Sequence, residues 1–157
     1  MRERRRRVRQ ASDSFERVER EMTLLARYRY MAMAQTTRLE RSAYVLLCRI
    51  EVDGPLSIGQ LVEALGLDTS TLNRQTAAMT RAGLVERIPD PEGGLARKFR
   101  MTEEGAQKLH ADREDAVTNL ERVLADWSPE ETGAFAAALE RFNTRIETII
   151  GQPWPRP

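Results

Sequence analysis

Hydrophobic residues recur at intervals of three or four in the first part of the chain, which is the spacing of one face of a helix. Between residues 13 and 35 this pattern predicts a long first helix with a single apolar side. Its apolar positions are Val18, Met22, Leu25, Tyr28 (or its neighbour Arg29) and Ala32. A more apolar run over residues 41–52, RSAYVLLCRIEV, predicts a second helix that ends at Gly54 and Pro55.

The next segment carries the start and stop signals of two further helices. Ser57 and Gln60 have the S-x-x-Q spacing of a capping box, which predicts a short third helix. Gly66 stands where such a helix ends in a left-handed residue. Asp68 can then cap a fourth helix that runs to about Ala82. Two helices joined by a short turn with a glycine are typical of a helix-turn-helix.

Beyond Gly83 apolar and polar positions alternate, which is the period of a strand. Residues 84–88 and 97–101 predict two strands, and the turn residues between them, PDPEGG, join these strands into a β-hairpin. Thr102 can cap a fifth helix that runs to about Trp127. A hairpin directly after a helix-turn-helix predicts a winged helix.

The last helix is unusually apolar for the end of a chain. Ser128 and Pro129 are residue types that begin a helix. Apolar side chains follow at helical spacing: Phe135, Leu139, Phe142, Ile146, Ile149 and Ile150. We expect this face to be buried against a partner helix in a symmetric dimer.

The order of these elements predicts a mainly α protein. Its fold class is a winged helix-turn-helix with a two-stranded β wing, flanked by long N- and C-terminal dimerisation helices. The expected regions are a basic disordered arm over residues 1–12, a helical dimerisation region over 13–37 and 103–150, a winged helix-turn-helix over 38–102 and an irregular tail over 151–157.

The fourth helix has one apolar and one polar side. Leu72, Thr76 and Met79 fall on the side that must pack on a core. The first two turns present other residues to solvent, and these are Ser70, Thr71, Asn73, Arg74 and, near the edge, Gln75. Arginine pairs with guanine and asparagine or glutamine with adenine, so this face fits the major groove of DNA.

Four motifs together resemble the MarR family of bacterial transcription regulators. They are SIGQLVEALGL (residues 57–67), LVER (84–87), DPE (90–92) and TEEG (102–105). The likeness covers nearly the whole chain. It implies a homodimer, formed by the first, fifth and sixth helices, that binds a palindromic operator in double-stranded DNA. Most members of the family are repressors, and many release DNA when a small anionic or phenolic effector binds. The resemblance places the groove contacts on the same five residues.

The wing departs from the pattern of the family. An arginine commonly follows the Asp-Pro-Glu motif and enters the minor groove, whereas Gly93, Gly94 and Leu95 stand here. Arg97 lies two residues further on and is a candidate substitute. We expect phosphate contacts from the basic residues of the wing, namely Arg87, Arg97 and Lys98.

The resemblance also implies an effector pocket where the first, second and fifth helices meet the winged helix. Tyr28 and Tyr44 are the aromatic residues available to line such a pocket, and Arg29 or Arg49 is available for an anion. The alternative for each of these residues is an ordinary core aromatic or a solvated arginine.

Charge and composition exclude some classes of function, but they do not identify a binding partner. The chain of 157 residues has 25 basic and 24 acidic side chains, a net charge of +1, so only the location of charge can indicate DNA binding. All basic residues except Lys98 and Lys108 are arginine, which reflects either phosphate recognition or the codon bias of a GC-rich genome. No apolar run is long enough for a membrane span and no signal peptide is evident, so we expect a cytoplasmic protein.

Reactive residues are few. His110 is the only histidine, and its neighbours do not make a metal site; Cys48 is the only cysteine and lies in an apolar helical run. The sequence therefore predicts no enzyme, no cofactor and no metal. Two alternatives to a ligand-relieved repressor remain: a winged helix that binds only proteins, and a thiol-based redox-sensing regulator acting through Cys48.

Overall fold

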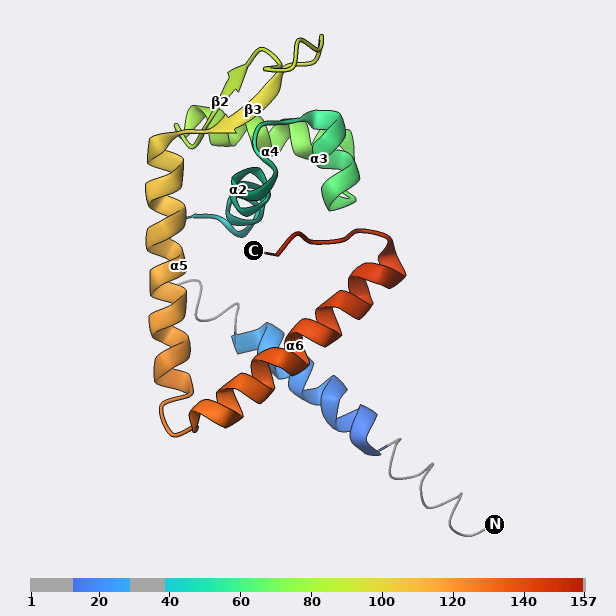
Figure 1. Cartoon of the computed structure of the whole chain (residues 1–157), viewed down its shortest axis with the longest axis vertical. Coiled ribbons are helices and arrows are strands. Elements are labelled where there is room, and N and C mark those ends of the chain that lie inside the picture. Colours follow the sequence, from blue (N-terminus) through green and yellow to red (C-terminus); the bar gives the residue numbers. More distant parts are fainter. Residues whose placement is uncertain (1–12, 29–38, 157) are drawn as a thin grey trace, which may run out of the picture. The chain divides into compact units, whose positions relative to one another are not determined.

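The computed structural model describes residues 13–28 and 39–156 of the chain (Figure 1). It contains two compact units, over residues 1–37 and 38–157. In the first unit, residues 13–28 are helical as predicted, and the rest of the predicted first helix lies outside the described residues. The apolar side chains of this helix are exposed: Phe15, Val18, Met22, Leu25 and Tyr28.

The second unit contains helices and one small sheet. Its elements are α2 (Arg41–Asp53), β1 (Leu56–Ser57), α3 (Ile58–Leu65), α4 (Thr69–Arg81), β2 (Val85–Ile88), β3 (Lys98–Met101), α5 (Glu103–Val123) and α6 (Pro129–Ile150). The antiparallel sheet has the strand order β1-β3-β2. This arrangement confirms the predicted mainly α fold with a winged helix-turn-helix. None of the described helices is long and apolar enough to cross a membrane.

The sheet holds one strand more than the sequence predicted. Strands β2 and β3 form the expected hairpin, with Val85 opposite Met101. The additional strand, β1, pairs Leu56 with Phe99 and Ser57 with Lys98. Ser57 was predicted only as a helix cap, but it also ends this short strand before α3 begins.

The predicted caps position the helices. Ser57 forms a complete capping box at α3, and Gly66 ends α3 in the left-handed conformation with φ 63°. The side chains of Asp68, Thr102 and Ser128 cap α4, α5 and α6, each accepting a hydrogen bond from a backbone N–H three residues on. These side chains satisfy backbone donors that helix starts leave unpaired.

Helix α5 ends four residues before the predicted end at Trp127. Leu124 is the C-cap residue, and the N–H of Trp127 donates to the Leu124 carbonyl in a turn rather than continuing the helix. The indole ring of Trp127 meets the ring of Phe135 edge to face, with centroids 5.5 Å apart. The turn thereby leads directly into α6.

The hydrophobic core of the second unit lies between α2, α3, α4 and the sheet. Leu47, Leu61 and Leu72 are fully buried there, and each such side chain contributes about 1.5–3 kcal/mol to folding. Leu72, Thr76 and Met79 are the buried residues of α4, as the sequence predicted. The core therefore fixes which face of α4 remains in solvent.

The base of the wing is joined closely to the start of α5. The Thr102 hydroxyl donates to the Gly83 carbonyl at 2.6 Å, and the backbone N–H of Thr102 donates to the Leu84 carbonyl at 3.1 Å. At Gly105 a Cβ atom would collide with that same carbonyl of Leu84, so the helix can approach the sheet only with glycine at this position.

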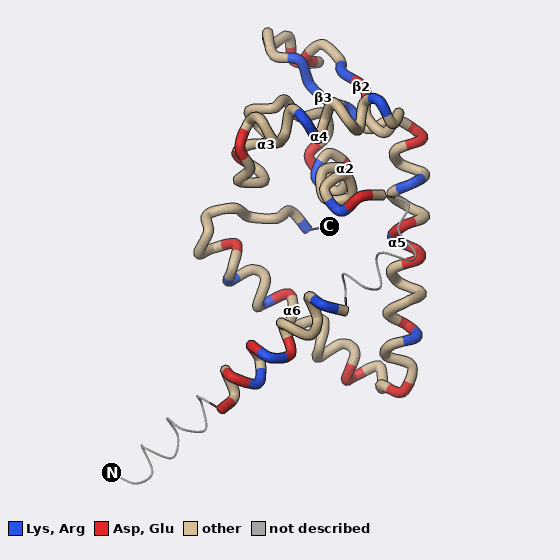
Figure 2. The backbone as a smooth tube through the Cα atoms, turned by 180° about the vertical axis from the view of Figure 1, so that it is seen from behind, with Lys and Arg blue, Asp and Glu red and all other residues tan. Residues whose placement is uncertain are grey.

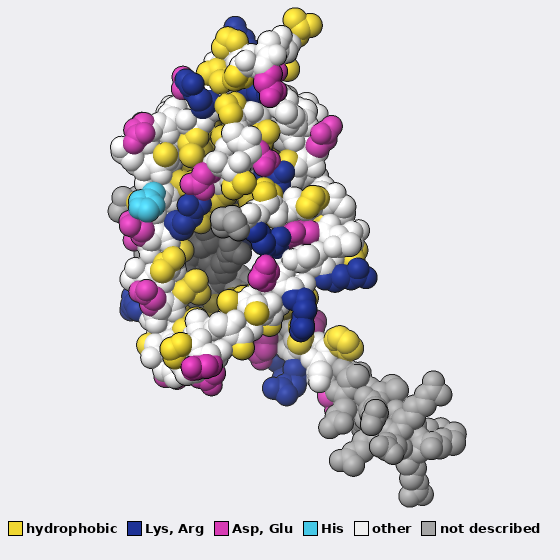
Figure 3. Space-filling view, in the orientation of Figure 1, with side chains coloured by type: hydrophobic (Ala, Val, Ile, Leu, Met, Phe, Trp, Pro, Cys, Tyr) yellow, Lys and Arg dark blue, Asp and Glu magenta, His cyan; other side chains and the backbone are white. Residues whose placement is uncertain are grey.

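The second half of α5 and the whole of α6 expose many apolar side chains. No residue of α6 is buried, although the helix carries its predicted apolar stripe. The exposed set on the two helices includes Val117, Leu120, Val123, Phe135, Leu139, Phe142, Ile146, Ile149 and Ile150. Figure 3 shows hydrophobic side chains on the surface of this part of the chain. A patch of this extent marks an interaction surface.

Candidate nucleic-acid interface

The start of α4 is held by one carboxylate. Asp68 accepts hydrogen bonds from the Thr71 N–H at 2.8 Å, the Thr71 hydroxyl at 2.7 Å and the Ser70 hydroxyl. These donors, the Ser70 hydroxyl first, hold the pKa of Asp68 well below its usual value. The hydroxyls of Ser70 and Thr71 thus serve the cap as donors, and their oxygens can still accept hydrogen bonds.

The next three predicted contact residues differ in exposure. Asn73 and Arg74 are exposed, and they lie one turn into α4. Gln75 is half-buried, and its Oε1 atom is shielded from solvent without a hydrogen-bond donor among the described residues. Asn73 and Arg74 are therefore the two side chains of this set that are free to reach base edges.

A groove with a volume of about 690 Å³ lies between α4 and the wing. Its walls include Asn73, Ala77 and Arg81 from α4, and Arg87 and Arg97 from the wing. Ser57, Ile58 and Gly59 at the start of α3 also line the groove. Small residues such as Ala77 leave room for a close approach, and the arginines make the groove suited to a phosphate backbone.

Charge is distributed unevenly over the winged helix, as Figure 2 shows for α4 and both wing strands. Among the described residues from Leu56 to Met101, four arginines make no ion pair or hydrogen bond through their side chains: Arg74, Arg81, Arg87 and Arg97. By contrast, Arg100 is paired across the hairpin with Glu86 at 2.8 Å. Arg81 was not among the predicted contacts. Its position two turns after Arg74, on the same face of the helix, could have indicated it.

Lys98 does not belong to this free set. Only 7% of the residue is exposed, and its Nζ atom lies 2.9 Å from Asp90 and 3.3 Å from Glu92. The hydrogen bond to Asp90 raises the pKa of Lys98, and the same bond lowers the pKa of Asp90. The ammonium group closes the wing loop onto β3, so the structure does not place it for the phosphate contact that the sequence predicted.

The tip of the wing is apolar. Gly93 adopts a φ of 82° and donates its N–H to the Asp90 carbonyl at 3.0 Å, which completes the turn. Leu95 beyond this turn is fully exposed. Arg97 instead lies in the wall of the groove.

The structure describes three of the four residues predicted for an effector pocket, namely Tyr28, Tyr44 and Arg49. Tyr28 belongs to the first unit, and Arg29 lies outside the described residues. Tyr44 is half-buried beside Arg113 of α5, and burial raises its pKa. Arg49 contacts the C-terminal tail instead. Tyr44 and Arg49 therefore face different neighbours.

Cys48 and His110, the candidate reactive residues, each contact a charged side chain. Cys48 is half-buried against the core, as predicted, with its Sγ atom 3.9 Å from a guanidinium nitrogen of Arg113. Arg113 also pairs with Glu51 at 2.7 Å, which lowers the pKa of that carboxyl. His110 lies on the helix surface, 3.2 Å from Glu114. No cluster of potential metal ligands exists among the described residues.

A helix-turn-helix, a hairpin wing and free arginines on both define a winged-helix protein of the DNA-binding class. The sequence model described as "MarR family" matches residues 39–93. Over 137 residues the chain is 36% identical to YxaD of Bacillus subtilis (strain 168), an uncharacterized HTH-type transcriptional regulator, covering 85% of this chain and 96% of that protein. The chain belongs to the MarR family; it is a transcription regulator and not an enzyme.

Solved structures agree with this assignment. A MarR family protein from Bacillus stearothermophilus is similar with a TM-score of 0.66 and 25% identity, covering 83% of this chain and 96% of that one. The PcaV transcriptional regulator from Streptomyces coelicolor, in complex with its natural ligand, shares the fold with a TM-score of 0.61 and 21% identity, covering 78% and 88%.

Proposed function

We propose that this regulator is a cytoplasmic homodimer that represses transcription from a palindromic site in double-stranded DNA until a small anionic or phenolic ligand binds. DNA binding is supported by the difference between paired and unpaired basic side chains in the winged helix. Arg74 and Arg81 of α4 and Arg87 and Arg97 of the wing have no acidic partner among the described residues, whereas the neighbouring Lys98 and Arg100 are paired.

In this proposal α4 enters the major groove with its first two turns. Arg74 pairs with a guanine and Asn73 with an adenine, each contributing about 1–3 kcal/mol of base discrimination. Ser70 and Thr71 approach the flanking phosphates beside the Asp68 cap. Arg81, Arg87 and Arg97 line the groove between α4 and the wing, and they hold the backbone of the DNA there.

The exposed apolar faces of α5 and α6 support the dimer. A second copy of the same surface, related by a twofold axis, would remove these exposed apolar side chains from water. The predicted dimerisation region over residues 13–37 and 103–150 contains both faces. In such a dimer the two copies of α4 lie about 34 Å apart, so that each meets one half of a palindrome.

Relief by a ligand is proposed from family resemblance and from the ligand-bound PcaV relative. A ligand acts only if it binds better to a dimer whose recognition helices are wrongly spaced for DNA. Coupling of about 1–3 kcal/mol lowers DNA affinity by roughly 5–150-fold, and DNA weakens ligand binding by the same factor.

Selection of a bound sequence from random double-stranded DNA, followed by fluorescence anisotropy, tests the DNA part. Arg74→Ala is expected to cost about 1–3 kcal/mol and to relax one base position. Arg97→Ala is expected to weaken binding to all sequences and to lower the salt slope by roughly one. Arg100→Ala is the matched control on the same wing, because Glu86 already pairs with that arginine.

The proposal fails if no sequence is enriched, which would favour a winged helix that binds only proteins. It also fails if Arg100→Ala weakens binding as much as Arg97→Ala. Selective loss of A/T preference at the flanks in Arg97→Ala would instead assign minor-groove readout to Arg97.

A further inference from the structure

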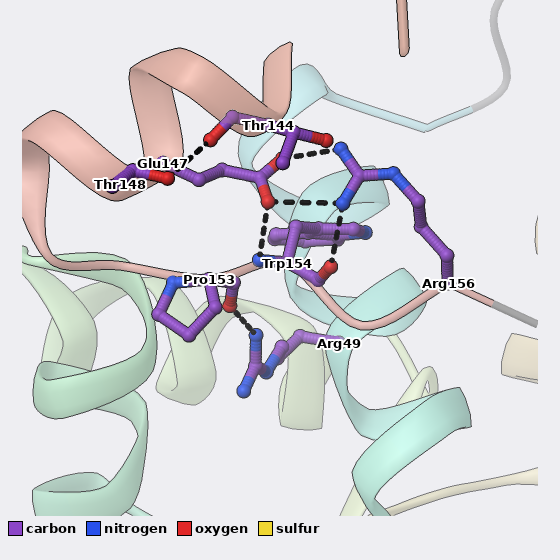
Figure 4. A network of polar contacts seen from close by, with 7 residues as sticks. All are labelled: Arg49, Thr144, Glu147, Thr148, Pro153, Trp154 and Arg156. Carbon is purple, nitrogen blue, oxygen red and sulfur yellow. Dashed lines mark hydrogen bonds and ion pairs between the residues drawn. The ribbon is translucent and has the colours of Figure 1, made fainter. Parts of the chain in front are cut away.

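The C-terminal tail returns from α6 to the helix-turn-helix (Figure 4). Helix α6 ends at Gly151 in the left-handed conformation, with φ 71°. Gln152 follows, and its N–H donates to the Glu147 carbonyl at 3.1 Å. The side chain of Gln152 occupies the space that a Cβ atom would need at Gly66. The tail therefore touches the turn that leads into the recognition helix α4.

A second anchor joins the tail to α2. The Nη1 atom of Arg49 donates to the Pro153 carbonyl at 3.0 Å, and its guanidinium lies 5.6 Å from the centre of the Trp154 ring. Asp53 pairs with the Nε atom of the same arginine, and only 13% of the Arg49 side chain is exposed. The guanidinium is thus fixed between its own helix and the indole by hydrogen bonds and a cation–π contact.

The tail is also tied back to its own helix. A carboxylate oxygen of Glu147 accepts from the Trp154 N–H at 3.2 Å, and the same side chain forms two hydrogen bonds with Arg156. Arg156 donates in addition to the Trp154 carbonyl at 3.1 Å. These bonds hold residues 152–156 in one shape, so a shift of α6 must be transmitted to α2 and to the turn at Gly66.

We propose that residues 152–156 are a strap that fixes α6 against the helix-turn-helix, and that Trp154 and Arg49 are positioning residues that set the half-site spacing this regulator accepts. The inference rests on the proposed DNA-binding dimer. Since α6 buries none of its own residues within the chain, the strap supplies the contacts that hold it to the winged helix at this end. Among the described residues, no hydrogen bond or ion pair joins the strap to Arg74 or to the wing, so the strap acts on the spacing of the recognition helices and leaves base contacts unchanged.

The test uses the full-length protein and palindromes from the selected site, with the half-sites moved one or two base pairs closer or further apart. For Trp154→Ala, we expect affinity at the best spacing to fall about fivefold, which is about 1 kcal/mol. Affinity for a single half-site should stay within about twofold, so discrimination between spacings falls. Trp154→Phe keeps an aromatic face for Arg49 and should restore discrimination. Thr144→Ala, on helix α6, should leave discrimination unchanged.

A loss of affinity that is equal at all spacings, or unchanged discrimination, would overturn the proposal. Hydrogen exchange of the free protein separates this failure from failure of the proposed function. In Trp154→Ala the amides of residues 147–154 should exchange about fivefold faster or more, whether or not any DNA is bound. If these rates match those of the unaltered protein, the strap does not exist.

Discussion

Replacing Phe142 by alanine tests whether the exposed face of α6 is a dimer interface. Phe142 lies in the middle of the apolar stripe, between Leu139 and Ile146, and 42% of its surface is exposed within one chain. No described residue of the same chain buries it. A partner that covers this face must therefore bury the ring, and its removal should weaken association rather than folding.

The size of the effect follows from the exposed area. A phenylalanine side chain presents about 200 Å², so 42% corresponds to roughly 80 Å². At about 25 cal/mol per Å² this area is worth about 2 kcal/mol. A twofold interface contains the residue twice, which gives about 4 kcal/mol, or roughly a thousandfold increase in the dimer dissociation constant.

Sedimentation equilibrium over a range of protein concentrations measures that constant directly. Thr144→Ala is the matched control, because it removes an exposed side chain from the opposite side of α6. Circular dichroism should show that Phe142→Ala retains its helices and unfolds cooperatively. A dissociation constant within about threefold of that of the unaltered protein would refute the assignment of this face to the interface.

Two further predictions concern the DNA-binding unit. Hydrogen bonds lower the pKa of Asp68 in the folded state, so its stabilising effect is complete above its unfolded pKa of about 3.9 and is lost as the pH falls through the folded value. The melting temperature should therefore exceed that of Asp68→Asn near neutral pH, and the difference should shrink in acid; a constant difference would contradict the cap. Lys98→Met should leave the salt slope of DNA binding unchanged, because Asp90 and Glu92 already hold the ammonium group, and a slope reduced by about one would restore Lys98 as a phosphate contact.

The sequence predicted those features that depend on neighbours within a few residues. The caps at Ser57, Asp68, Thr102 and Ser128 all form as expected, since a capping side chain reaches a backbone N–H only three positions away. The buried face of α4 was also predicted, because helical spacing alone places Leu72 on the same side as its core neighbours.

Contacts between distant residues had no such local signal. The strand β1 exists because Leu56 meets Phe99, and nothing in its two residues marks a strand. Arg49 and Pro153 are 104 positions apart, so the anchoring of the tail depends on the whole fold. Lys98 was predicted to contact phosphate because it lies on a strand rich in basic residues. Only the folded loop brings Asp90 and Glu92 back to its ammonium group.

The continuous course of α5 gives small movements a large effect at the DNA. The helix has 21 residues, a length of about 31 Å, and its first turn is fixed to the base of the wing through Thr102 and Gly105. It therefore works as a lever whose arm is nearly as long as one turn of DNA. A tilt of roughly 5° at the far end displaces the wing by about 3 Å, which is the length of one hydrogen bond. In the proposed complex, a small rearrangement far from the DNA is thus sufficient to separate a wing arginine from its phosphate.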